Sequence, residues 1–175
     1  NLLKYLRFQM STLVAYIAIF IGAGIFDIAG GIPLNPLQIL WINMVVDIPI
    51  AIALGFDEPS PGLMARSPRP VGAPVLSTKN WVRLCVQGFV MTIGTLVAYQ
   101  IGESAYDPAV ASTMLLTTLS LFHLAAGLLA RDQVRTIFSR VALPGPTQLR
   151  RYGLALVAII LVTEIGFLQR VFSTV

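Results

Sequence analysis

The chain has 175 residues, of which 56% are hydrophobic and only 11% charged, and its mean hydropathy is +0.80. Soluble globular domains carry roughly twice that share of charge, so this composition excludes an ordinary soluble domain and indicates a membrane protein. The net charge of +4 does not predict nucleic-acid binding, because the basic residues are confined to particular connecting segments.

Five apolar stretches of spanning length follow one another along the chain. A helix rises about 1.5 Å per residue, so about 20 apolar residues cross a hydrocarbon core of about 30 Å. We therefore predict an all-α, multi-pass transmembrane helical bundle of about five spans, the last of which is the shortest. The predicted spans are residues 8–26, 36–56, 81–101, 109–130 and 152–168.

Basic residues fall on alternate connections between these predicted spans. Lys4 and Arg7 precede the first span, and more basic residues follow the second and the fourth spans. The other two connections carry only acidic charge. Positive charge marks the cytoplasmic side of membrane proteins, so we predict a cytoplasmic N-terminus. The later basic residues are Arg66, Arg69, Lys79 and Arg83 in one connection and Arg131, Arg135, Arg140, Arg150 and Arg151 in the other.

The same pattern divides the chain into three segments. Residues 1–56 are expected to form a transmembrane hairpin that carries the candidate ion site. Residues 57–80 are expected to form a Pro-rich cytoplasmic loop, because proline blocks regular structure, and composition alone favours a linker over a docking surface. Residues 81–175 are expected to add three further transmembrane helices, with a basic cytoplasmic loop at residues 131–151.

Asp47 lies near the middle of the second predicted span, where a charged side chain costs about 3 kcal/mol or more. Asn43 precedes it by four residues, which places both side chains on one face of a helix. Pro49 lacks a backbone donor and crowds the carbonyl of Val45, so we predict a helix break there. Carboxylate, amide and freed carbonyl oxygens suit hard cations. We predict that Asn43 and Asp47 bind a cation; an aspartate hydrogen-bonded between helices, with a proline kink, is the alternative.

Other polar residues in the predicted spans have simpler explanations. His123 is expected to hydrogen-bond to a neighbouring helix, with a proton or metal role as the alternative. Glu164 lies near Arg170 and the far end of its span, which favours an interfacial or structural role. Cys85 has no partner for an internal disulfide and is expected to pack. The sequence has no phosphate-binding glycine loop and no nucleophile triad, so we expect no hydrolysis by this chain alone.

One part of the second span resembles a known family. Leu-Trp-Ile-Asn-Met-Val-Val-Asp at 40–47, Ala-Leu-Gly-Phe at 53–56 and Met-Ala-Arg-Ser-Pro-Arg at 64–69 closely resemble the sixth transmembrane helix and next loop of calcium-type (P2-like) P-type ATPases. Residues 1–12 are similar to the start of the fifth helix, and residues 161–170 to the region before the tenth. The resemblance covers essentially the whole chain and implies that its spans are helices five to nine of such a pump.

The resemblance implies an ion translocase that pumps a cation with energy from ATP, which binds with Mg²⁺ in domains outside this chain. It places Asn43 and Asp47 at two ion-ligand positions, and Asp57, Arg66 and Arg69 in a loop that docks on the phosphorylation domain. The implied partners are the transported cation, the lipid bilayer and the N-terminal part of the same pump. No nucleic acid is expected, and the plasma (cell) membrane is the expected location.

Several residues depart from the family's pattern. Leu13 and Tyr16 stand where calcium pumps have an asparagine and a glutamate, and Val46 and Ile48 replace a threonine and a glycine beside the aspartate. These departures imply at most one cation site and leave the ion open.

Because the chain begins at Asn1 rather than Met, we expect it to be cut from a longer polypeptide. A stand-alone or degenerate membrane module that binds or regulates without ATPase activity is the alternative.

Overall fold

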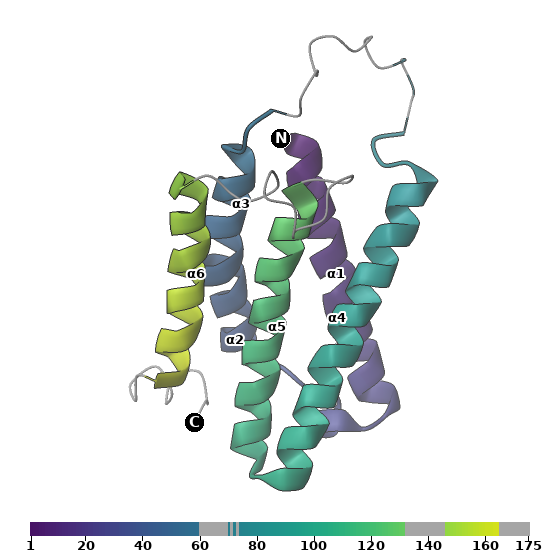
Figure 1. Cartoon of the computed structure of the whole chain (residues 1–175). Helices are drawn as coiled ribbons and strands as arrows, with labels where there is room; N and C mark the ends of the chain where they lie inside the picture. The colour runs from purple at the N-terminus through teal and green to yellow at the C-terminus, as the bar shows by residue number, and fades with distance from the viewer. Residues whose placement is uncertain (60–69, 71, 73, 132–145, 165–175) are drawn as a thin grey trace.

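The computed structural model describes residues 1–59, 70, 72, 74–131 and 146–164. Every regular element among these residues is helical, and the long helices stand side by side (Figure 1). The predicted all-α bundle is therefore confirmed. The elements are α1 (Leu2–Ile25), η1 (Ile28–Gly31), α2 (Pro36–Trp41), η2 (Ile42–Asp47), α3 (Ile48–Gly55), α4 (Thr78–Ala105), α5 (Pro108–Arg131) and α6 (Pro146–Glu164).

Four helical stretches among the described residues are long and apolar enough to cross a membrane. They are α1, the continuous run Pro36–Gly55 formed by α2, η2 and α3, then α4 and α5. The fifth predicted span, residues 152–168, lies partly outside the described residues, and its described part belongs to α6, which packs against α3 and α5. The structure thus agrees with a membrane bundle.

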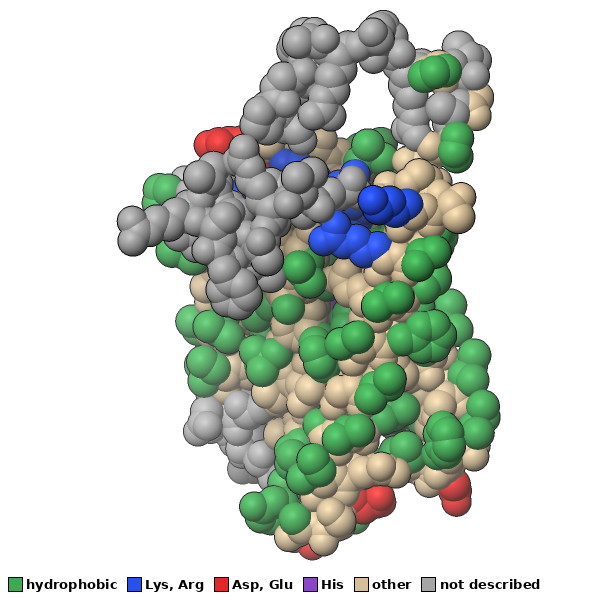
Figure 2. Space-filling model, turned by 45° about the vertical axis from the view of Figure 1, so that its right-hand side comes forward, with side chains coloured by type: hydrophobic (Ala, Val, Ile, Leu, Met, Phe, Trp, Pro, Cys, Tyr) green, Lys and Arg blue, Asp and Glu red, His purple; other side chains and the backbone are tan. Residues whose placement is uncertain are grey.

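Charge is distributed along the bundle as the sequence predicts. Figure 2 shows Lys and Arg side chains gathered near one end, hydrophobic side chains around the middle, and Asp and Glu side chains at the opposite end as well as beside the basic end. The N-terminus lies at the basic end (Figure 1). The positive-inside rule predicts that this end faces the cytoplasm.

A tight turn joins the first two spans. Asp27 and Ala29 adopt positive φ values of 50° and 55°, and Gly30 and Gly31 follow with 61° and 78°. Only glycine takes this conformation without strain, so two glycines in succession favour the reversal. Asn35 then caps the next helix, because its side chain accepts a hydrogen bond from the backbone N–H of Gln38 at 2.8 Å. The expected tight hairpin is present.

Small residues let the helices approach closely. A Cβ atom on Gly88 of α4 would lie 2.6 Å from Cγ1 of Val14 on α1. A Cβ atom on Gly102 would lie 2.7 Å from the Cα of Ala111 on α5. Helices in lipid associate through such contacts, since burial from water does not drive their packing.

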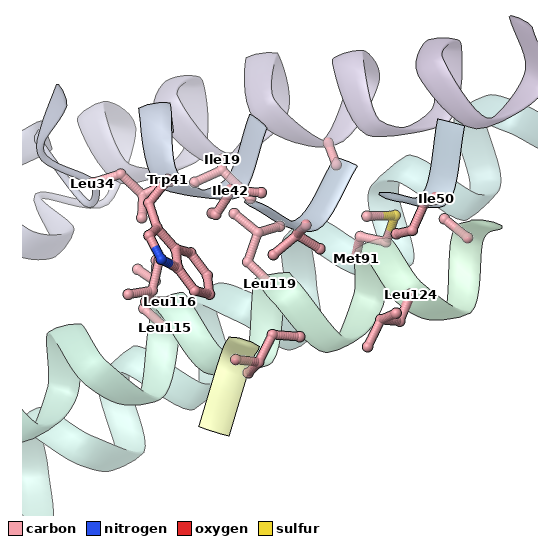
Figure 3. Packing of buried hydrophobic residues seen from close by; sticks show 14 of the residues in the cluster. Ile19, Leu34, Trp41, Ile42, Ile50, Met91, Leu115, Leu116, Leu119 and Leu124 are labelled. Atoms are coloured by element: carbon pink, nitrogen blue, oxygen red, sulfur yellow. The ribbon is translucent and has the colours of Figure 1, made fainter. Parts of the chain in front are cut away.

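The buried side chains of several helices meet in one cluster. Figure 3 shows Ile19 of α1, Ile42 of η2 and Leu119 of α5 within this cluster, and all three are fully buried. Ile50 of α3 is buried in the same cluster. The second span therefore lies against α1 and α5, and its inward side chains face those two helices.

Candidate cation site

The second span changes its helical geometry just before the candidate site. Residues Ile42–Asp47 form a π-helical stretch, and α-helix resumes at Ile48. Pro49 lies in the first turn of α3, where its missing N–H is tolerated. The helix break predicted at Pro49 is thus not present, because the chain stays helical through Pro49. The helix is irregular just before it, in the π-helical stretch that ends at Asp47. Single π-helical turns are rare and frequently occur at functional sites.

Asp47 is directed into the bundle and is paired there. The residue is only 7% exposed, and its Oδ1 lies 2.7 Å from Nδ1 of His123 on α5. An ionised carboxylate accepts hydrogen bonds only, so the imidazole Nδ1–H donates to it. Among the described residues, no other side chain hydrogen-bonds to Asp47. The carboxylate therefore has one partner, which carries no permanent charge.

Two aromatic rings of α1 hold the imidazole in place. The ring of Tyr16 meets His123 edge-on, with centroids 5.3 Å apart and planes at 78°. The ring of Phe8 meets it at 6.3 Å and 87°. His123 itself is completely buried. Its position is thus fixed from α1 as well as by the hydrogen bond to Asp47.

Asn43 does not share the environment of Asp47. It is exposed on the described bundle, whereas Asp47 is buried. A four-residue spacing keeps the two side chains within about one turn of each other, but only Asp47 lies on the side of the second span that packs against the described helices. The structure brings Asp47 together with His123 and leaves Asn43 on the outer side of the second span.

A second buried aspartate lies at the basic end of the bundle. Oδ2 of Asp57 accepts a hydrogen bond from Nζ of Lys4 at 2.6 Å, and Oδ1 accepts from Nη2 and Nε of Arg131 at 2.9 and 3.2 Å. Asn1 donates to the backbone oxygen of Asp57 at 2.7 Å. Asp57 therefore joins the start of α1, the end of α3 and the end of α5.

The remaining residues of the predicted docking loop, Arg66 and Arg69, lie outside the described residues. Glu164 ends α6, and Cys85 is a partly buried free thiol in α4. No cluster of three or more His, Cys, Asp or Glu side chains suited to a metal occurs in the described part of the chain. A cation at Asp47 would consequently need oxygen ligands from amides, from the backbone or from chain beyond these helices.

Sequence reasoning missed all three side-chain partners that the structure gives to the two aspartates: His123 for Asp47, and Lys4 and Arg131 for Asp57. His123 was expected to hydrogen-bond to a neighbouring helix, and the structure identifies Asp47 as that partner. The sequence offers one signal, since Ser120, His123 and Gly127 recur at helical spacing, and the structure shows all three buried on α5. No local pattern connects Lys4 with residues more than fifty positions away.

Comparison with known proteins decides the family. The family model described as "Cation transporting ATPase, C-terminus" matches residues 31–175, which is well over half of the chain. The chain belongs to this family. The resemblance of its sequence to calcium-type P-type ATPases is thereby confirmed, and the chain corresponds to the C-terminal membrane part of such a protein.

Three relatives of this cation-transporting ATPase chain cover it almost completely. It is 32% identical to a calcium-transporting ATPase of Bacillus subtilis, over 100% of the chain and 20% of that protein. It is 31% identical to calcium-transporting ATPase 1 of Yarrowia lipolytica, over 99% of the chain and 19% of that protein. It is 28% identical to the human calcium-transporting ATPase type 2C member 2, over 99% of the chain and 18% of that protein.

The chain therefore spans about a fifth of the length of these relatives. The family match includes the π-helical stretch with Asn43 and Asp47 and also His123, and it begins after Leu13 and Tyr16. With four apolar helices of spanning length among the described residues, this ATPase chain is an integral membrane protein.

Proposed function

We propose that this chain is the membrane transport portion of a P-type ATPase that pumps a cation of the calcium-like class. Asp47 is the proposed central ligand and Asn43 a second one. The ATP and Mg²⁺ are proposed to bind in the N-terminal part of the same pump, which is its principal protein partner. The plasma membrane is the proposed location.

The observation that carries this proposal is the set of partners around Asp47. A carboxylate in the middle of a membrane-spanning helix needs a compensating partner. The described residues offer Asp47 one hydrogen bond and no permanently charged side chain. A transported cation would supply the missing positive charge while it is bound, and the adjacent π-helical stretch supports a site at this level of the helix.

The printed names of the relatives support calcium as the first ion to test. The relatives from Bacillus subtilis, Yarrowia lipolytica and human all carry the name calcium-transporting ATPase. Ca²⁺ binds six to eight oxygen ligands in proteins. Tyr16 faces the imidazole of His123 at the position of a family glutamate, so this chain offers few such oxygens and the pumped ion is left to experiment.

The experiment is an ion screen of the intact pump, in membrane vesicles, with and without the Asp47→Asn substitution. ATPase activity is measured against Ca²⁺, Mn²⁺, Mg²⁺, Na⁺, K⁺ and H⁺. We expect one of these ions to stimulate the unmodified pump and Asp47→Asn to reduce that stimulation at least about a hundredfold, because the amide carries no charge.

Asp107→Asn is the matched control, since it makes the same chemical change at an exposed position before α5. We expect this variant to keep normal stimulation. Full stimulation and transport in Asp47→Asn would refute the ligand assignment. No ATPase activity with any ion in the unmodified protein would favour the binding or regulatory module instead.

A further inference from the structure

His123 has a geometry that the family match does not explain. Its Nδ1–H donates to Oδ1 of Asp47 at 2.7 Å, and its side chain is completely shielded. The rings of Phe8 and Tyr16 contact it edge-on from α1. A histidine held by packing on one side and by a carboxylate on the other has little freedom to turn.

The second nitrogen of the same ring is not engaged. Nε2 of His123 and the hydroxyl of Tyr16 are both buried and have no hydrogen-bond partner among the described residues. Buried polar atoms are normally paired. Among the described residues, the hydrogen bond between Nδ1 and Asp47 is therefore the only one that the ring makes.

The hydrogen bond to His123 uses Oδ1, one of the two side-chain oxygens of Asp47. The Asp47 side chain retains 9% exposure, and Oδ2 is not among the buried atoms that lack a partner. Rotation of the carboxylate about its Cβ–Cγ bond would break the contact with Nδ1, so the carboxylate presents Oδ2 in one fixed direction.

We propose that His123 is a positioning residue of the cation site: through Nδ1 it fixes the carboxylate of Asp47, so that one oxygen is presented to the transported cation. This inference rests on the proposed function and deepens it. Ligands of a metal site are commonly oriented by hydrogen bonds from residues behind them, and losing such a partner typically weakens metal affinity 10- to 100-fold. His123 acts in this way from behind Asp47 and does not itself contact the cation.

Two isosteric variants test the inference in the intact pump. The amide nitrogen of asparagine lies as many bonds from Cβ as Nδ1 of histidine does, and the amide nitrogen of glutamine is as remote as Nε2. We expect His123→Asn to keep the cation concentration for half-maximal ATPase activity within about threefold of the unmodified pump. We expect His123→Gln and His123→Leu to raise it about 10- to 100-fold.

Ser120→Ala is the matched control on the same helix. Ser120 is completely buried three residues before His123, and its hydroxyl donates to the carbonyl of Leu116 in its own helix at 2.7 Å. We expect this variant to keep the half-maximal cation concentration of the unmodified pump. The maximal rate and the amount of folded pump in the membrane are measured alongside for every variant.

The outcomes separate this inference from the proposed function. A purely structural role for His123 would lower the maximal rate and the folded amount in all three variants, with the half-maximal concentration unchanged; that result overturns the inference. Equal affinities of His123→Asn and His123→Gln also overturn it, even where His123→Leu does not accumulate. If Asp47→Asn keeps full stimulation, the proposed function itself fails. His123 then has no role in a cation site, whatever affinities its variants show.

Discussion

Two aspartates are buried among the described residues, and they differ in what surrounds them. Asp57, at the basic end of the bundle, is 5% exposed and pairs with Lys4 at 2.6 Å and Arg131 at 2.9 Å. Asp47, inside the second span, is 7% exposed and pairs with His123 at 2.7 Å. The two aspartates are thus almost equally buried, but their charges are not equally compensated. Asp57 has two charged partners, whereas Asp47 has no permanently charged partner among the described residues.

This difference separates a structural carboxylate from a candidate transport ligand. Two cationic side chains already compensate the carboxylate of Asp57, so a further cation gains little there. Among the described residues, Asp47 has no permanently charged partner that would compensate an ionised carboxylate. Burial alone therefore does not distinguish the two aspartates, and the proposal that Asp47 is a transport ligand rests on the charge of their partners.

The largest effect on stability is expected at Asp57. Asp57→Ala leaves the buried ammonium of Lys4 and the half-buried guanidinium of Arg131 without this carboxylate, and removing one member of a buried ion pair costs about 3–5 kcal/mol. The prediction is a loss of that size in the free energy of unfolding of the intact pump, measured by denaturation in mixed micelles. Asp107→Asn, at an exposed acid directly before α5, is the control; asparagine keeps a side-chain oxygen at the helix N-terminus, so it is expected to change the free energy by less than about 0.5 kcal/mol.

A loss below about 1 kcal/mol in Asp57→Ala would break the comparison. That value is typical of solvated surface pairs, and it would mean that water reaches Lys4 and Arg131 once the carboxylate is gone. Asp57 would then be no more structural than Asp47, and the contrast between the two aspartates would lose its energetic basis.

A smaller loss is expected where α1 and α4 approach each other. Gly88→Ala adds a Cβ atom that would lie 2.6 Å from Cγ1 of Val14 and 3.0 Å from the backbone oxygen of Ser11. Overpacking of this kind costs about 1–3 kcal/mol, and the same unfolding measurement would detect it. Gly24→Ala is the matched control, because a Cβ atom there meets nothing within 4 Å, and a loss of equal size in both variants would rule out this contact as the cause.

Much of the fold could be predicted from the sequence. Apolar stretches of spanning length and alternating basic connections predict the helices and their direction, because the bilayer imposes both. Pro49 predicts an irregular helix at the level of Asp47, but the π-helical form of the stretch Ile42–Asp47 could not be predicted, since a proline is compatible with a kink as well as with a widened turn. The exposure of Asn43 beside a buried Asp47 could not be predicted from their four-residue spacing either, because it depends on which side of the second span packs against the described helices.

The candidate site was only half predictable for a related reason. Asp47 stands out in the sequence because its charge is out of place in an apolar run. Its partner does not stand out, because His123 lies 76 residues away and only the packing of α5 against the second span brings the two together. Lys4 and Arg131 meet Asp57 in the same long-range manner.

The smallest effect on stability is expected at Asp47, where the effect on transport is expected to be the largest. The side-chain oxygen of an asparagine still accepts the hydrogen bond from Nδ1–H of His123, and the neutral amide no longer carries a charge into the bundle. Asp47→Asn is therefore expected to leave the free energy of unfolding within about 0.5 kcal/mol of the unmodified pump, or to raise it. The denaturation experiment used for Asp57→Ala checks this in the absence of the transported cation. A loss of 3 kcal/mol or more would instead show that the charge of Asp47 stabilises the folded bundle as that of Asp57 does, and would make the loss of transport in this variant a consequence of unfolding.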